Sequence, residues 1–449
     1  MKARANNLKT TRVRESGALL IIVLWVAFGL VAITLYFANA MNHELRAADN
    51  RAANIAAGQT VAGAARYLSN YLSTVAIAGE MPQPDEDFEC EAVPVGQCKY
   101  WLIGRETNDW EINLTVPAFG LVDEASKINL NAPWLTAELI EYLPGMTPQI
   151  AAAIMDWRDT NTDVTADGAE DEAYSRLDYA YRAKNAPFES VEELRLVNGM
   201  TAEILYGEDA NLNGILDANE NDADDSAPTD NRDGRLDRGL MEYFTVYSYE
   251  PASGTNITSR TNVQALLQEV LPARAGEIMG QPGMNAAAFN TINSVLGLYL
   301  SSGMTEDEFT LVAEHLAPTT NLTVNVNTAS EAVLECVPGI GTQFAAQLIS
   351  FRESNPSRLG TVAWVFYALG EDEAAARAVG PFITTRSYQY TADIAAVGPY
   401  NRGYQRVRYV FDTSEEAPKV IHRQDLSHLG WALGRETRTE LLAARKELR

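Results

Sequence analysis

The chain has 449 residues, 46% of them hydrophobic and 21% charged, which excludes a disordered or fibrous protein and allows two or three globular domains. Its formal net charge is -25, so its surface repels nucleic acid and anionic lipid and attracts cations. The three cysteines and four scattered histidines lack the spacing of a zinc site.

An uncharged apolar stretch, residues 18–38, predicts a membrane-spanning helix near the N-terminus. As a helix it would extend about 32 Å, close to the hydrocarbon thickness of a bilayer. The residues before it carry five basic groups against Glu15. This asymmetry predicts that they stay in the cytoplasm and that the rest of the chain is exported.

A small-residue break, Ser16-Gly17, precedes the apolar stretch, whereas the cleavage site of a secretory signal follows it. The arrangement resembles the class III signal of type IV pilins and pseudopilins, whose prepilin peptidase cuts after a glycine. The resemblance implies a leader of residues 1–17 and cleavage between Gly17 and Ala18. Most such proteins have a glutamate fifth in the mature chain, where this sequence has Ile22. An uncleaved anchor is the alternative.

Apolar residues continue at three- and four-residue steps beyond residue 38, and no proline occurs before Pro82. The pattern predicts one helix over residues 18–75, half in the membrane and half packed on a domain, which is the pilin body plan. A membrane helix followed by an ordinary stalk is the alternative.

Alternating sequences predict strands on both sides of a long helical region. Residues 100–103 and 110–116 predict a hairpin, and residues 387–394 and 404–411 predict two later strands. This order predicts an α+β fold in which a helical domain is inserted into a small antiparallel sheet domain. A separate C-terminal β-domain is the alternative.

The expected division of the chain follows from these elements. It comprises the leader 1–17, the N-terminal helix 18–75, a β-region 76–123, an inserted helical domain 124–320, a second helix-hairpin-helix segment 321–384, a C-terminal β-region 385–425 and a charged tail 426–449.

The cysteines are expected to differ in role. Cys90 and Cys98 close a short loop in a region predicted to lie outside the cytoplasm, so we expect a disulfide between them. Cys336 lies in an apolar helical run and is expected to be a buried free thiol.

Two segments, 128–158 and 324–352, have the pattern of a helix-hairpin-helix unit, and residues 188–201 form a weaker third copy. A glycine in each turn supplies a positive φ, and the threonine that follows, Thr147 or Thr342, can cap the second helix. DNA-binding versions offer backbone N–H groups to a phosphate at such a turn. Here no lysine or arginine occurs in residues 342–346, so we interpret the hairpins as packing units and expect no nucleic acid.

One acidic loop matches the twelve-residue EF-hand calcium loop. Oxygen-bearing side chains occupy its first, third, fifth, ninth and twelfth positions, and Gly214 is sixth. The expected calcium ligands are Asp209, Asn211, Asn213, the carbonyl of Ile215, Asp217 and Glu220. A merely solvated acidic loop is the alternative.

A second loop is a partial match. Asn231, Asp233 and Asp237 repeat the middle of the pattern, but Thr229 and Leu240 occupy its ends, so an ion there needs ligands from elsewhere. An upstream cluster is a further possible contributor, or simply a wet surface: Asp163, Asp167, Glu170, Asp171 and Glu172.

Several segments together resemble general secretion pathway protein K, the K-type minor pseudopilin of type II secretion. These segments are 127–131, 156–159, 168–171, 181–188, 191–194, 199–201 and 206–209. Ile22 agrees with them, because the missing glutamate is typical of that family. The resemblance implies a pilin-like domain with a large calcium-binding helical insert, placed at the pseudopilus tip with other minor pseudopilins.

The same resemblance implies a single-pass protein of the inner membrane with most of its chain in the periplasm. No catalytic motif occurs, so we expect no enzyme. The alternative function is a membrane-anchored helix-hairpin-helix DNA-binding protein of the competence-receptor type.

Overall fold

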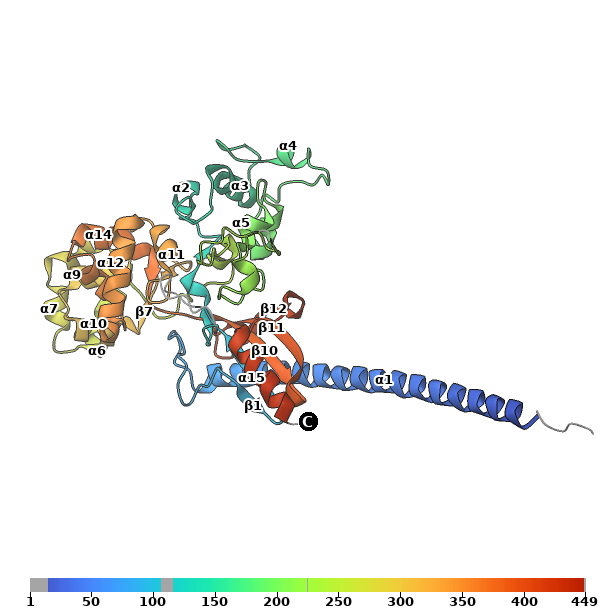
Figure 1. Cartoon of the computed structure of the whole chain (residues 1–449). Helices are drawn as coiled ribbons and strands as arrows, with labels where there is room; N and C mark the ends of the chain where they lie inside the picture. Colours follow the sequence, from blue (N-terminus) through green and yellow to red (C-terminus); the bar gives the residue numbers. More distant parts are fainter. Residues whose placement is uncertain (1–14, 106–115, 224, 448–449) are drawn as a thin grey trace, which may run out of the picture.

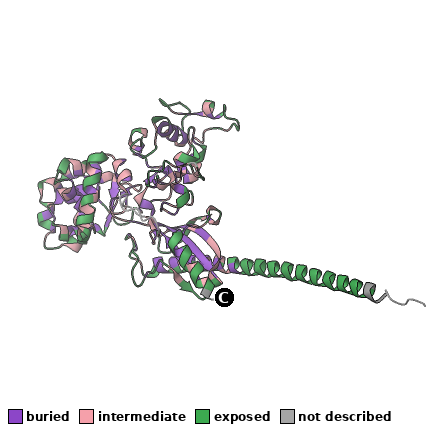
Figure 2. Cartoon of the chain, in the orientation of Figure 1, coloured by how far each residue is buried: buried purple, intermediate pink, exposed green. Residues whose placement is uncertain are grey.

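The computed structural model describes residues 15–105, 116–223 and 225–447. Helix α1, Glu15–Thr74, forms one unbroken element of 60 residues (Figure 1). Its first half projects from the molecule with its apolar side chains exposed, and its second half packs on the sheet (Figure 2). Among the described helices, α1 alone is long and apolar enough to cross a membrane. Residues 1–14 of the expected leader lie outside the described residues.

A six-stranded antiparallel sheet supports the second half of α1. Its order is β1-β2-β10-β11-β12, and β3 also pairs with β10. The strands are β1 Val93–Val95, β2 Cys98–Ile103, β3 Val122–Asp123, β10 Gln389–Gly398, β11 Arg402–Asp412 and β12 Lys419–Asp425. Because β2 and β10 are hydrogen-bonded neighbours, the helical region between them is an insertion, and the alternative of a separate C-terminal β-domain is wrong.

Both faces of the sheet are covered. On one face Leu68 of α1 packs in a cluster with Ile394 of β10. On the opposite face Trp101 of β2 packs against Ala432 and Leu433, which lead into helix α15, Gly434–Glu447. The segment expected to be a charged tail therefore begins as part of the core.

The hairpin of β2 forms with β1 through a turn at Gly96, which has φ +62°. The sequence predicted a different partner, residues 110–116, of which 110–115 lie outside the described residues. Strand β1 has only three residues, and the middle one is Pro94, so it carries almost no alternating pattern.

The expected disulfide is absent, because Cys90 and Cys98 are both buried free thiols. The Cys90 carbonyl accepts a hydrogen bond from the N–H of Leu102 at 2.8 Å, four residues along β2 from Cys98. At about 3.3 Å per residue this is a displacement of about 13 Å, whereas a disulfide requires Cα atoms within about 7 Å. Cys336 is buried as a free thiol, as expected.

The helical insert consists of three successive units, each closed by a two-residue parallel strand pair. These pairs are β4 Ile128–Asn129 with β5 Phe244–Thr245, β6 Thr255–Asn256 with β7 Leu316–Ala317, and β8 Val324–Asn325 with β9 Ile383–Thr384. In each unit the asparagine of the first strand, Asn129, Asn256 or Asn325, accepts a hydrogen bond from the N–H two residues later. The strand and asparagine that begin the two predicted units thus also begin a third unit, at Thr255–Asn256.

The two main helix-hairpin-helix units are formed by α2 Ala137–Ile140 with α3 Pro148–Arg158, and by α11 Glu331–Glu335 with α12 Gly341–Ser354. Their turns contain Gly145 at φ +74° and Gly339 at φ +85°. Thr147 caps α3 as expected, by accepting a hydrogen bond from Ile150 N–H at 3.3 Å. Thr342 does not cap α12, because this helix already begins at Gly341.

The remaining described α-helices of the insert are short. They are α4 Asp171–Tyr174, α5 Ala202–Tyr206, α6 Arg260–Val270, α7 Ala275–Met279, α8 Ala286–Phe289, α9 Val295–Ser302, α10 Glu306–Ala313, α13 Trp364–Ala368 and α14 Glu373–Val379.

Candidate metal centre

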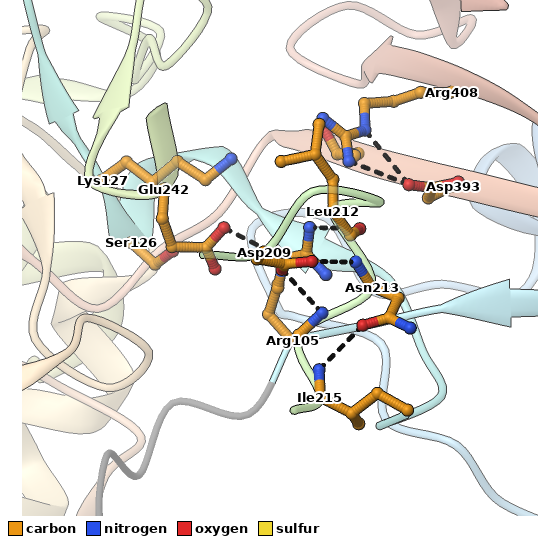
Figure 3. A network of polar contacts seen from close by, with 12 residues as sticks. Arg105, Ser126, Lys127, Asp209, Leu212, Asn213, Ile215, Glu242, Asp393 and Arg408 are labelled. Atoms are coloured by element: carbon orange, nitrogen blue, oxygen red, sulfur yellow. Dashed lines mark hydrogen bonds and ion pairs between the residues drawn. The ribbon is translucent and has the colours of Figure 1, made fainter. Parts of the chain in front are cut away.

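The loop over residues 209–220 follows helix α5 and ends in a short 3₁₀ helix, Ala218–Glu220. The two Asp209 carboxylate oxygens accept hydrogen bonds from the N–H groups of Asn213 and Gly214, both at 2.9 Å (Figure 3). Gly214 has φ +77°, which allows the sharp turn that these bonds close. The sharp turn that Gly214 was expected to allow is therefore present.

Glu220 closes the loop from its other end. One carboxylate oxygen accepts a hydrogen bond from Ala210 N–H at 3.0 Å and the other from Asp217 N–H at 2.9 Å. The side chain is buried, with 1% of the residue exposed. The side chain of Glu220, at the twelfth position, thus binds the backbone at the second position, Ala210, and at the ninth, Asp217.

The two asparagines gather at the Asp217 carboxylate, to which Asn211 donates at 2.7 Å and Asn213 at 3.0 Å. The amide oxygen of Asn213 accepts from Ile215 N–H at 2.9 Å. The amide oxygen of Asn211 is buried without a hydrogen-bond partner. An oxygen left this way is an available ligand for a hard cation.

The buried carboxylates of the loop are electrostatically unfavourable. Burial raises the pKa of Glu220 to about 8, and the negative charges of Asp209 and Asp217 add to this rise. Burial also raises the pKa of Asp209, although the nearby Arg105 opposes the shift. A divalent cation would relieve the repulsion between these groups.

The donor set fits calcium in kind, because it combines carboxylate and amide oxygens in one loop. In the part of the chain that the structure describes, no three His, Cys, Asp or Glu side chains are gathered as a metal site. The carboxylates of Asp209 and Glu220 bind backbone N–H groups instead.

The second loop receives its closing acid from outside its own sequence. Glu208 accepts hydrogen bonds from the N–H groups of Asn231 at 3.0 Å and Asp237 at 3.2 Å. Within the loop Asn231 donates to Asp237 at 3.0 Å, and the N–H of Asp233 donates to the amide oxygen of Asn231 at 2.8 Å. Glu208 therefore has the role that Glu220 has in the first loop, and it directly precedes Asp209, so the two loops adjoin.

A third loop emerges from the upstream acidic cluster. Asp159 and Glu170 have the same twelve-residue spacing as Asp209 and Glu220. The Asp159 carboxylate accepts a hydrogen bond from Asn161 N–H at 3.1 Å, and the Asn161 amide oxygen accepts from Asp163 N–H at 2.7 Å. Glu170 is 3% exposed, and both its oxygens are buried without a hydrogen-bond partner. The twelve-residue spacing of Asp159 and Glu170 could have identified this loop from the sequence. The loop differs from the EF-hand pattern at the sixth position, where it has Val164 in place of glycine.

The helix-hairpin-helix units use their arginines internally. Arg158 at the end of α3 donates to the carbonyls of Leu130 at 2.6 Å, Ala132 at 3.0 Å and Leu135 at 2.7 Å. Arg352 in α12 donates equivalently to the carbonyls of Val326 and Ala329. These guanidinium groups join each hairpin to the strand before it, which supports the interpretation as packing units.

Comparison with known proteins gives two family matches. Residues 122–206 match the family model described as type II secretion system (T2SS), protein K, and residues 320–357 match the helix-hairpin-helix motif. The type II secretion system protein K of Klebsiella pneumoniae is 36% identical over 85 residues, which are 18% of this chain and 26% of that protein. The match therefore spans about a quarter of the relative's length.

Among solved structures, the chain is similar to one in the GspK-GspI-GspJ complex from the enterotoxigenic Escherichia coli type 2 secretion system. The similarity has a TM-score of 0.39 at 12% identity and covers 86% of this chain and 99% of that chain. The family model and the Klebsiella relative thus show that residues 122–206 are similar to type II secretion system protein K, in agreement with the resemblance expected from the sequence.

Proposed function

We propose that this chain is a minor pseudopilin of a type II secretion system and forms part of the pseudopilus tip complex, with a structural rather than an enzymatic role. The observation that carries the proposal is the protein K match over residues 122–206, in a chain whose N-terminal helix is half exposed and half packed on a sheet. The proposed location is the inner membrane, crossed once by α1, with the remainder in the periplasm.

The place of the helical insert supports the position at the tip. The insert lies on the side of the sheet away from the projecting half of α1 (Figure 1). A subunit stacked beyond the sheet would have to occupy the space that the insert fills. Ile22 agrees with this position, because a topmost subunit has no neighbour above it whose N-terminal amine a glutamate would neutralise.

We further propose that calcium binds the loop 209–220. Asp209, Asn211, Asn213, the Ile215 carbonyl, Asp217 and Glu220 would hold the ion, which would supply charge neutralisation and rigidity, not catalysis. Asn231, Asp233 and Asp237 are a second candidate set, which Glu208 completes.

A complementation experiment tests the pseudopilin function. A secretion-competent host lacking its own protein K should regain export of its folded substrates when this chain is supplied with its cognate minor pseudopilins. Cysteine cross-linking through α1 should capture those pseudopilins as partners. No rescue, combined with retention of DNA by the full chain on a filter, would favour the DNA-receptor alternative instead.

A further inference from the structure

A fully buried arginine joins the loop 209–220 to the sheet. Arg406 of β11 is 0% exposed and is among the largest fully buried side chains. Its guanidinium donates one hydrogen bond to the Asn211 carbonyl and another to the Leu212 carbonyl, the latter at 2.6 Å. Both acceptors lie within the first half of the loop, among the proposed ligands.

Asp393 of β10 fixes the orientation of this guanidinium. Its two carboxylate oxygens accept from Arg406 at 2.8 and 2.7 Å, in a bidentate pair. Arg408 donates to the same carboxylate at 2.9 Å (Figure 3), but no hydrogen bond joins it to the loop. Asp393 is thus shared by one arginine that reaches the loop and one that does not.

A second arginine approaches the same carbonyl from the end of β2. Arg105 donates to the Leu212 carbonyl at 2.7 Å and to the Glu242 carboxylate at 3.0 Å (Figure 3). Leu212 has φ +54°, a left-handed conformation that is unfavourable for a leucine. Two guanidinium donors on one carbonyl hold the backbone in that conformation.

The consequence concerns the spacing of the proposed ligands. Leu212 lies between Asn211 and Asn213, so the conformation of its backbone sets how these two side chains stand relative to one another. Both arginines donate to backbone carbonyls of the loop and not to the side-chain oxygens proposed as ligands. The arrangement of the proposed ligands around a cation therefore depends on the sheet as well as on the loop.

We propose that Arg406 is a positioning residue for the cation-binding loop and couples cation binding to the docking of the helical insert on the sheet. This inference rests on the proposed binding of calcium by residues 209–220. Because coupling is reciprocal, an ion that orders the loop tightens its contact with the sheet, and a loop released from Arg406 binds the ion less tightly.

The test is hydrogen exchange on the full chain in detergent, titrated with calcium. The readout is the calcium concentration that half-protects the peptide covering residues 209–220. In Arg406→Gln this midpoint should rise about tenfold, within the usual range of coupling between linked sites. In the matched control Arg408→Gln, which loses a contact to Asp393 but none to the loop, it should change less than twofold.

The possible results distinguish the positioning role of Arg406 from the calcium binding on which it rests. A wild-type loop without calcium-dependent protection would overturn both. Calcium protection in the wild type with the same midpoint in Arg406→Gln, or with equal shifts in both variants, would overturn the positioning role alone. If Arg406→Gln does not fold, Arg105→Gln decides, because it removes the other donor to Leu212: a raised midpoint supports the inference and an unchanged one refutes it.

Discussion

At the scale of single residues, buried charge is the feature that separates the loops from the sheet. In the sheet the buried carboxylate of Asp393 has two cationic partners, Arg406 and Arg408. In the loops Glu220 and Glu170 are buried without a cationic side chain bound to them, and burial raises the pKa of both. The two environments predict different responses to removal of a negative charge.

Glu220→Gln should abolish the stabilisation of the protein by calcium. The substitution keeps the shape of the side chain but removes the anionic oxygens that would bind the ion, and it leaves one oxygen for the N–H groups of Ala210 and Asp217, so a smaller loss of stability is expected in chelator as well. The wild type should gain about 2.7 kcal/mol at a calcium concentration a hundred times the dissociation constant. Thermal melts in calcium and in EDTA measure the difference, with the exposed Glu269→Gln on α6 as the matched control. A variant that keeps the full calcium response would show that Glu220 is not a ligand.

Asp393→Asn should destabilise the fold itself, by about 3–5 kcal/mol near neutral pH. The substitution leaves the buried Arg406 and its neighbour Arg408 without their counter-charge. The arginines hold the pKa of Asp393 well below its usual range. A group with a lowered folded-state pKa contributes stability above its unfolded pKa and loses it as pH falls toward the folded value. The deficit of the variant should therefore shrink as the pH falls below about 4. Denaturant unfolding at several pH values measures this loss of unfolding free energy. The control is Asp412→Asn, whose carboxylate has no arginine partner in the described structure and which should lose little stability at any pH.

At the scale of elements, helices and strands with a long periodic pattern were predictable from the sequence. Elements that form only through contacts with distant parts of the chain were missed. Helix α1 was predictable from its apolar run and lack of proline, and β10 and β11 from their alternation. Strand β1 was missed because three residues carry no period. Helix α15 was taken for a tail because half of its residues are charged, and the fully buried residues of this segment, Ala432 and Leu433, precede the helix.

The candidate site divides in the same way. The loop 209–220 was predictable because all of its ligand positions lie in one twelve-residue segment. Glu208 could not be assigned to the second loop from sequence, since 23 residues separate it from Asn231, whose N–H it accepts. The arginines that hold the first loop come from strands far away in the chain, and no local spacing identifies them.

Leu433→Ala tests the role of the segment that leads into α15. Leu433 is fully buried against the face of the sheet opposite α1, so its truncation should cost about 2–5 kcal/mol of unfolding free energy. Leu442→Ala is the matched control, because Leu442 lies on α15 with 48% of its surface exposed, and it should change stability by less than about 0.5 kcal/mol. Equal, small losses in urea unfolding would mean that the C-terminal segment is not part of the core.

At the scale of the whole molecule, the exposed half of α1 and the insert lie at opposite ends of the sheet domain (Figure 1). None of the described residues covers the exposed half, and lipid and neighbouring α1 helices are its proposed surroundings. Processing at the N-terminus and position in the assembly therefore both depend on this one helix.

Processing should occur between Gly17 and Ala18. When the chain is co-expressed with a prepilin peptidase, mass spectrometry of the purified protein should show a mature N-terminus at Ala18. Gly17→Val should leave the full-length chain, because a branched side chain replaces the hydrogen at the cut site, whereas Gly29→Ala, within the apolar stretch, should be processed normally. A wild-type protein that still begins at Met1 would leave the uncleaved anchor as the correct interpretation.

The tip position makes a prediction about Ile22. At the top of an assembly a carboxylate at this place would meet no amine from a subunit above and would lie unpaired among apolar helices, at a cost of several kcal/mol. Ile22→Glu should therefore reduce secretion in the complementation assay several-fold, whereas Ile22→Leu should not. Cross-linking should place the wild-type chain above its partner pseudopilins in every product that contains it. If Ile22→Glu secretes normally and cross-links capture subunits stacked above the insert, the chain belongs within the shaft and the proposed tip position is wrong.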